Sequence, residues 1–247
     1  MTKSFYIFGQ KNIQIKNPEK FKINVTGFQG VNCKSHMEFH KTNNSFDFIK
    51  ILINYKILNI ENKTVISLLK DVINNVNLKD DEIKKYLSEK NLDLDSLRDK
   101  INEKLYDDSS KQKTIEAVEK TCKKENINNP RKIDYQKRKN LIENLDTDEI
   151  KKSLSKEKRI NIVLDNYRVH HAKIVEKACK ILNIHLIFLP PYSPFLNPIE
   201  DVWRKIKKEI YKSYLKSLDH LKNLFKEAFH ETIDDKTLYE EWLETYI

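Results

Sequence analysis

The sequence predicts an α/β protein in which a mixed sheet is flanked by helices and interrupted by a long all-helical insertion. Three observations predict it. Residues 1–41 carry short alternating, β-branched and aromatic runs, which favour strands. Residues 159–189 have the pattern of strand, helix and strand. Between them, residues 57–157 contain no glycine, only one proline, Pro130, and apolar residues at helical spacing.

The opening segment predicts successive strands. They run from Ser4 to Phe8, Lys11 to Lys16, Phe21 to Thr26 and His36 to His40. The three glycines of the chain, Gly9, Gly27 and Gly30, fall here, and we expect them in turns. Ser45 is then expected to cap an apolar helix that includes Asp47.

The insertion is predicted from apolar faces at helical spacing. These are Val65, Leu69, Val72 and Val76; Leu94, Leu97, Ile101 and Leu105; and Ile115, Val118 and Cys122. Asp146 to Glu149 predicts a capping box before a further helix. The insertion could dimerise or clamp DNA, which the basic run from Lys111 to Lys139 would suit, or it could be a solvated spacer.

Residues 158–211 contain the highest density of residue types that can bind metal or act in catalysis. A strand from Arg159 to Leu164 ends in Asp165 and Asn166, a helix spans 173–182 and a second strand spans 185–189. Prolines 190, 191 and 194 then predict a rigid loop. The next helix is expected to have Asn197 as its N-cap, Pro198 at its first position and Glu200 in its first turn.

Simpler interpretations of these residues stay open. Glu200 could complete a capping box, and Asp165 with Asn166 could form a strand-end turn. His170 and His171 could face solvent at a helix start, and for His171 we prefer that interpretation. A cap and a metal ligand are not mutually exclusive.

Two motifs carry a family resemblance. Residues 164–172 are LDNYRVHHA, residues 189–203 are LPPYSPFLNPIEDVW, and 34 residues separate Asp165 from Glu200. Together they resemble the catalytic half of mariner-type DDE transposases. The resemblance implies an RNase H-like fold and metal-dependent cleavage and transfer of DNA strands at a site with two Mg²⁺ or Mn²⁺ ions. It makes Asp165 and Glu200 the second and third metal-binding acids, with Asn166 and His170 orienting the metal site or a DNA phosphate.

The family's first Asp has no counterpart, because no acidic residue precedes Glu19. The resemblance therefore implies a truncated catalytic domain that lacks the opening strand of its sheet and has an incomplete metal site. An upstream polypeptide could supply the missing Asp and the family's helix-turn-helix units. The alternatives are an inactive remnant that binds DNA or oligomerises, and an RNase H-like nuclease acting on RNA–DNA hybrids.

The expected partner is DNA, both transposon ends and target. The excess of 46 Lys and Arg over 37 Asp and Glu suits a polyanion, although abundant lysine could reflect compositional bias. Arg204, Lys205 and Lys208 give the helix after Glu200 a basic face that could contact phosphates or simply face solvent. A homodimer is possible.

The remaining expectations concern organisation and location. The predicted parts are 1–56 and 158–247, which form the catalytic domain, and 57–157, the insertion. With no long apolar run and no signal peptide, we expect a cytoplasmic protein without a membrane partner. The scattered cysteines predict reduced thiols, and further helices are expected over 218–229 and 238–246.

Overall fold

The computed structural model describes residues 4–14, 21–40, 42–89 and 130–233, together with positions 235, 240 and 244. For residues 4–14, 78–89 and 130–136 it describes the backbone alone. The chain divides into two compact units, one of residues 1–66 with 148–247 and one of residues 67–147. The second unit lies inside the predicted insertion.

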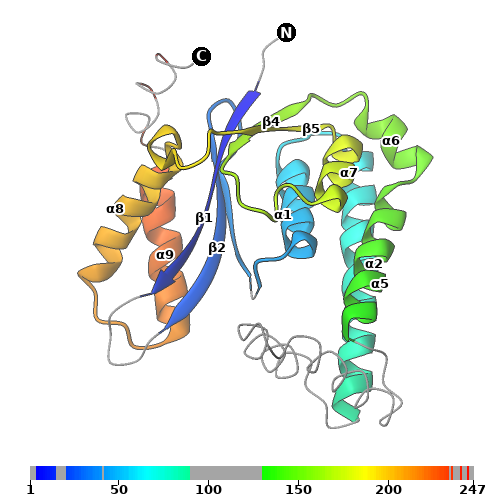
Figure 1. Ribbon diagram of the computed structural model, residues 1–247, viewed down its shortest axis with the longest axis horizontal. Helices are drawn as coiled ribbons and strands as arrows, with labels where there is room; N and C mark the ends of the chain where they lie inside the picture. The colour runs from blue at the N-terminus through cyan, green and yellow to red at the C-terminus, as the bar shows by residue number, and fades with distance from the viewer. Residues whose placement is uncertain are drawn as a thin grey trace. The chain divides into compact units, whose positions relative to one another are not determined.

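The first unit is built on a mixed sheet (Figure 1). Its strands are β1 (Ser4–Gln14), β2 (Lys22–Gly30), β3 (His36–His40), β4 (Ile160–Leu164) and β5 (Ile184–Phe188), in the order β3-β2-β1-β4-β5. β1, β2 and β3 pair antiparallel, whereas β4 and β5 are parallel to β1 and to each other. This is the RNase H-like arrangement that the resemblance implied, and the predicted fold class is confirmed.

Two predicted strands form one continuous strand, β1, so the prediction of a turn at Gly9 was wrong. Gly9 pairs with Gly27 in the middle of the β1–β2 ladder. At Gly27 an added Cβ would lie 2.5 Å from a ring carbon of Trp203, so glycine is needed here for close packing of a helix rather than for a turn. β1 also holds the sheet position beside β4, where we expected a strand to be missing.

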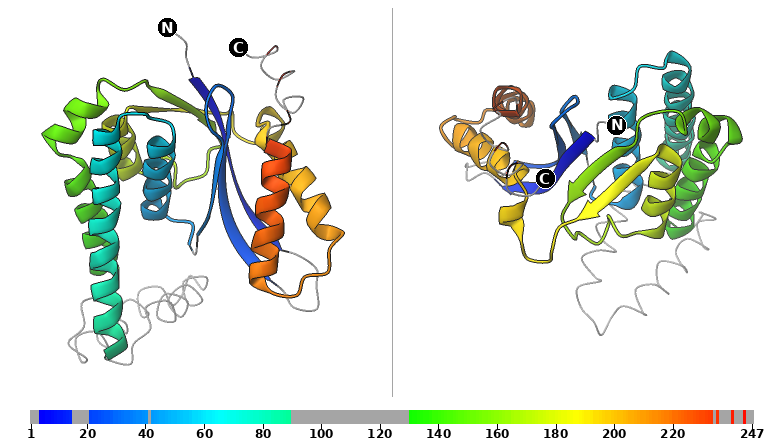
Figure 2. Two further views of the ribbon diagram at one scale, coloured as in Figure 1. Left: turned by 180° about the vertical axis from the view of Figure 1, so that it is seen from behind. Right: turned by 90° about the horizontal axis from the view of Figure 1, so that it is seen from above.

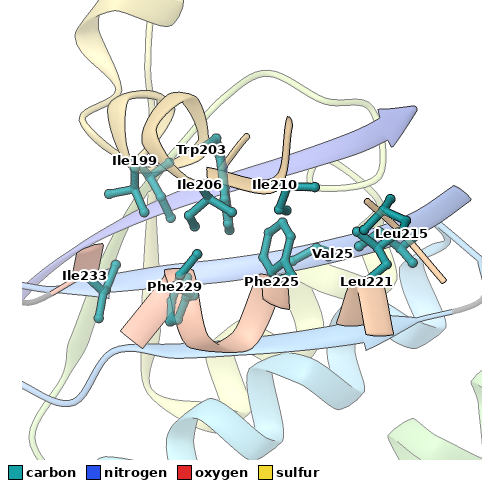
Figure 3. Close-up of a cluster of buried hydrophobic side chains, with 13 residues drawn as sticks. Val25, Ile199, Trp203, Ile206, Ile210, Leu215, Leu221, Phe225, Phe229 and Ile233 are labelled. Atoms are coloured by element: carbon teal, nitrogen blue, oxygen red, sulfur yellow. The ribbon is translucent and has the colours of Figure 1, made fainter. Parts of the chain in front are cut away.

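Helices α8 (Ile199–Tyr211) and α9 (Leu218–Ile233) cover one face of the sheet. Figure 3 shows their apolar side chains pointing toward one another and toward Val25 of β2. The buried members of this core are Ile23, Val25, Ile199, Val202, Trp203, Ile206, Ile210, Leu215, Leu221, Phe225, Ala228, Phe229 and Ile233. Burial of this apolar surface fixes α8, and with it the first turn that carries Glu200, against the sheet.

Helices α1 (Ser45–Leu58) and α7 (Lys173–Leu182) pack together on the other side, with α6 (Asp148–Leu154) against α7 (Figure 2). The ring of Phe28 on β2 stacks on Tyr55 of α1 at 4.2 Å. The expected cap at Ser45 was wrong: Asn44 caps α1, since its side chain accepts from the N–H of Asp47. Asp47 is therefore part of a helix start.

The helical unit contains α5 (Pro130–Leu145) and most of α2 (Lys63–Glu89), which run alongside each other (Figures 1 and 2). The predicted apolar face of Val65, Leu69, Val72 and Val76 is buried, as are Leu141, Ile142 and Leu145 of α5. The predicted faces at Leu94–Leu105 and Ile115–Cys122, and nearly all of the helix at 238–246, lie outside the described residues. None of the described helices could cross a membrane.

Candidate active site

Asp165 follows β4 at the carboxyl end of the parallel strands. The sheet register places Val163 and Gln29 on one face, since both are level with Ile7 of β1. Gly27, two residues from Gln29, shares that face and packs beneath α8. Side-chain alternation therefore points the position of Asp165, two residues after Val163, to the face that α8 covers. The edge beyond the carboxyl ends of parallel strands is where α/β proteins commonly form sites.

The carboxylate of Asp165 is held by two donors. His170 Nδ1 lies 3.1 Å from Asp165 Oδ1, and the N–H of Tyr167 donates to the same oxygen at 3.1 Å. Partial burial alone would raise the pKa of Asp165, but these hydrogen bonds and the nearby His170 and His171 outweigh it and lower the pKa below its usual value. The site therefore keeps an ionised, half-exposed carboxylate at neutral pH.

Asn166 connects the two strand ends. Its side-chain N–H donates to the backbone oxygen of Leu189, directly after β5, and its Oδ1 lies 3.2 Å from His171 Nε2. His171 also stacks on Phe188 at 4.1 Å. We preferred a solvent-facing role for His171; its side chain is exposed but is fixed by these two contacts. The two neighbouring histidines therefore contact different residues: His170 contacts Asp165, and His171 contacts Asn166.

The rigid loop predicted from the prolines leads from β5 to α8. It includes the short 3-10 helix η1 (Pro194–Leu196). Tyr192 in this loop has a left-handed backbone, with φ of 59°, and its side chain is fully exposed. The prolines explain the rigidity, but no residue type in this loop predicts the left-handed conformation of Tyr192.

Glu200 lies half-buried in the first turn of α8, beside Asp201. The prediction that Asn197 caps this helix was wrong. α8 begins without a side-chain cap, and the N–H groups of Glu200 and Asp201 donate to the backbone oxygens of Asn197 and Pro198, both at 3.0 Å. Pro198 lies before the first helical residue, because the backbone turns through η1 before the helix starts.

The predicted basic residues differ in their surroundings. Arg204 pairs with Asp201 one turn earlier, and Lys205 pairs with Asp235 at 2.7 Å. Lys208 is exposed. Because positions 200, 204 and 208 follow one another at four-residue spacing, Arg204 and Lys208 lie on the same line of α8 as Glu200, whereas Lys205 lies off it. Sequence reasoning missed Asp201, although its i,i+3 spacing to Arg204 was a usable signal.

The described carboxylates do not complete a two-metal site. Magnesium requires several hard oxygen ligands, and Asp165 and Glu200 offer two side chains. In the part of the chain that the structure describes, no group of three or more His, Cys, Asp or Glu side chains is arranged to hold a metal ion. The structure thus brings Asp165 and His170 together and leaves Glu200 outside such a group. β1, the strand beside Asp165, contains no acidic residue.

The comparison with protein families agrees with the motifs. A family model described as the DDE superfamily endonuclease matches residues 99–222. Among solved structures, the chain is similar to the catalytic domain of Mos1 mariner transposase, with 13% identity, a TM-score of 0.43, and coverage of 98% of this chain and 81% of that one. A search of curated proteins found no match.

Proposed function

Because the chain belongs to the DDE superfamily of endonucleases, we propose that it acts as the catalytic domain of a mariner-type transposase that cleaves and transfers DNA strands. The family expected from the sequence is thereby confirmed. The observation that carries the proposal is the carboxylate of Asp165 at the strand end, held in place by His170 and by the N–H of Tyr167. This is the edge at which a sheet-based site would receive DNA.

Asp165 and Glu200 are the two carboxylates of this chain that we assign to a divalent metal, Mg²⁺ or Mn²⁺. In this superfamily the metal supplies the charge that stabilises cleavage of the phosphodiester bond. His170 positions Asp165, and Asn166 positions the loop that precedes α8. Arg204 and Lys208, in line with Glu200, would hold DNA phosphates without reading sequence.

The third carboxylate must come from outside β1. Ile7 of β1 pairs with Val163 of β4, so two residues further along both strands Gly9 lies beside Asp165. Gly9 in turn pairs with Gly27, so the strand position beside Asp165 holds a glycine and offers no carboxylate. We propose that a second polypeptide supplies the missing acid, together with the DNA-reading domain. The same observation favours a second candidate function, an inactive relative that still binds DNA or forms a homodimer.

Nicking of supercoiled plasmid in Mg²⁺ or Mn²⁺ tests the proposal, with the chain alone and mixed with a polypeptide that carries an acidic strand, such as one encoded immediately upstream. We expect nicking only in the mixture. Nicking by the chain alone would contradict the need for a third acid. No nicking in either sample, with DNA binding intact, would favour the inactive relative.

The site residues are tested in the active sample. Asp165→Asn and Glu200→Gln should each abolish nicking and leave the circular dichroism spectrum unchanged. Glu209→Gln is the matched control, because Glu209 lies on the same helix but pairs with Lys212 in the last turns. Activity retained in both site variants would overturn the assignment.

A further inference from the structure

The loop between β5 and α8 presents aromatic rings to water beside the candidate site. Tyr192 is 100% exposed and Phe195 is 77% exposed. Large apolar rings normally gain free energy by burial, so two rings held outside on one short loop call for a partner. Neither ring belongs to the core that fixes α8.

Tyr192 is held in a strained backbone conformation. A left-handed conformation, with φ of 59°, is unfavourable for a bulky residue and is kept only where the surroundings impose it. Pro190 and Pro191 restrict the chain before it. After it, the hydroxyl of Ser193 donates to the backbone oxygen of Pro191 at 3.3 Å, and η1 closes the loop. Such residues cluster at binding sites, where the strain fixes a side chain in its working position.

The loop starts at the edge of the sheet that carries Asp165. The N–H of Leu189 donates to the backbone oxygen of Leu164 at 2.9 Å, and the side chain of Asn166 holds the oxygen of Leu189. Three residues can span at most about 11 Å, so Tyr192 stays within that distance of Leu189. A DNA strand that reached Asp165 would therefore lie within reach of the ring.

We propose that Tyr192 and Phe195 form a stacking platform for unpaired nucleobases of the DNA strand at this site. The inference rests on the proposed function, and it names the part of the DNA that this loop receives. A flat ring stacks on any base once that base has left the duplex, with little dependence on sequence. Because the loop is already rigid, stacking would cost little additional ordering. The basic line of Arg204 and Lys208 on α8 complements the backbone of the same strand.

The competing occupant of these rings is a second protein chain. Stacking predicts selectivity for unpaired bases, whereas a protein contact predicts a change in oligomeric mass. One set of variants separates the two.

The experiment measures binding of two labelled DNAs of equal length, without divalent metal, by fluorescence anisotropy. One is a fully paired duplex, and the other has several unpaired bases at one end, with 2-aminopurine among them. We expect Tyr192→Ala and Phe195→Ala each to weaken binding of the splayed DNA at least fivefold and to leave binding of the paired DNA unchanged. The protein should quench 2-aminopurine, and Tyr192→Ala should remove this quenching while Tyr192→Phe keeps it.

Tyr214→Ala is the matched control, because Tyr214 is 70% exposed but lies beyond α8. It should change neither affinity. Equal affinities of Tyr192→Ala and the wild type for splayed DNA would overturn the stacking platform, as would an equal loss on both DNAs. A lower oligomeric mass with unchanged DNA affinities would assign the rings to a protein contact. Failure of the wild type to bind either DNA would overturn the platform and also the direct contact of this chain with DNA that the proposed function includes, whereas binding of paired DNA alone would overturn only the platform.

Discussion

Asp165 Oδ1 lies 3.1 Å from Nδ1 of His170, and this contact joins a half-exposed carboxylate to a buried imidazole. The ring of His170 packs at 4.6 Å from that of Phe48 on α1. Because packing fixes the histidine, the histidine can fix the carboxylate. The position of the proposed catalytic group is therefore set by packing against α1, on the side of the sheet opposite α8 and α9.

The free energy of unfolding should fall less steeply with decreasing pH in Asp165→Asn than in the wild type. The pKa of Asp165 lies below its unfolded value of about 3.9, so its contribution is present above about pH 4 and is lost as the pH falls through the folded pKa. Chemical denaturation between pH 2.5 and pH 6, roughly the range of this titration, measures the effect. Identical acid slopes in variant and wild type would contradict the shift.

Asn166→Ala should cost about 1 kcal/mol of folding free energy, because the backbone oxygen of Leu189 loses its donor. Asn166→Asp keeps the shape but cannot donate, so it should behave like alanine. Both variants should lose nicking activity in the active mixture and keep duplex DNA affinity within about twofold, as expected for a positioning residue. Thermal denaturation and anisotropy measure the two effects. A normal melting temperature for Asn166→Asp would show that the donor is not needed.

Gly27→Ala should destabilise the fold by about 1–3 kcal/mol, because the new methyl group would meet the ring of Trp203 at 2.5 and 2.9 Å. Trp203→Phe removes the part of the ring that collides. The double variant should therefore be more stable than the sum of the two single losses predicts. Urea denaturation of the four proteins measures this coupling, and strict additivity would contradict the contact.

Lys56 is buried at the end of α1, where its ammonium group donates to the backbone oxygen of Lys158 at 2.9 Å. Burial lowers its pKa to about 8, although Glu157 acts in the opposite direction. Between this value and the unfolded pKa near 10.4, the unfolded chain binds more protons, so stability should rise with pH over that window. Lys56→Met should abolish the rise. Denaturation curves from pH 7 to pH 10.5 cover this titration.

The paired substitution Arg204→Ala with Lys208→Ala should weaken DNA binding equally across sequences. If each residue contacts one phosphate, the slope of log affinity against log salt should fall by about 2. Lys205→Ala is the comparison on the same helix, and its pairing with Asp235 predicts a smaller change. Anisotropy titrations at several salt concentrations give the slopes. An unchanged slope in the double variant would remove this line of α8 from the DNA path.

Local pattern was enough for the elements around the candidate site. The helix predicted over 173–182 is α7 with those bounds, and the strands on either side differ by about one residue at their ends. These elements are specified by apolar spacing and turn residues within each segment. The placement of Asp165 at a strand end followed from the same information.

Contacts between distant segments could not be predicted. Gly27 looked like a turn residue because nothing near it in sequence reveals Trp203, the side chain that needs the space. Asn166 was assigned to DNA or metal, but its contact with Leu189 depends on the pairing of β4 with β5. Tyr192 took a left-handed conformation that no composition rule assigns to tyrosine.

β1 has a further consequence for how the protein is made. It pairs with β2 on one side and with β4 on the other, yet β4 is encoded after the entire helical unit. A ribosome releases β1, β2 and β3 long before β4 exists, so until then the parallel side of β1 is an open edge able to pair with other chains. Such long-range pairing is slow to form. The nascent chain should therefore benefit from chaperones during synthesis, and its yield should depend on the rate of translation more than its final stability would suggest.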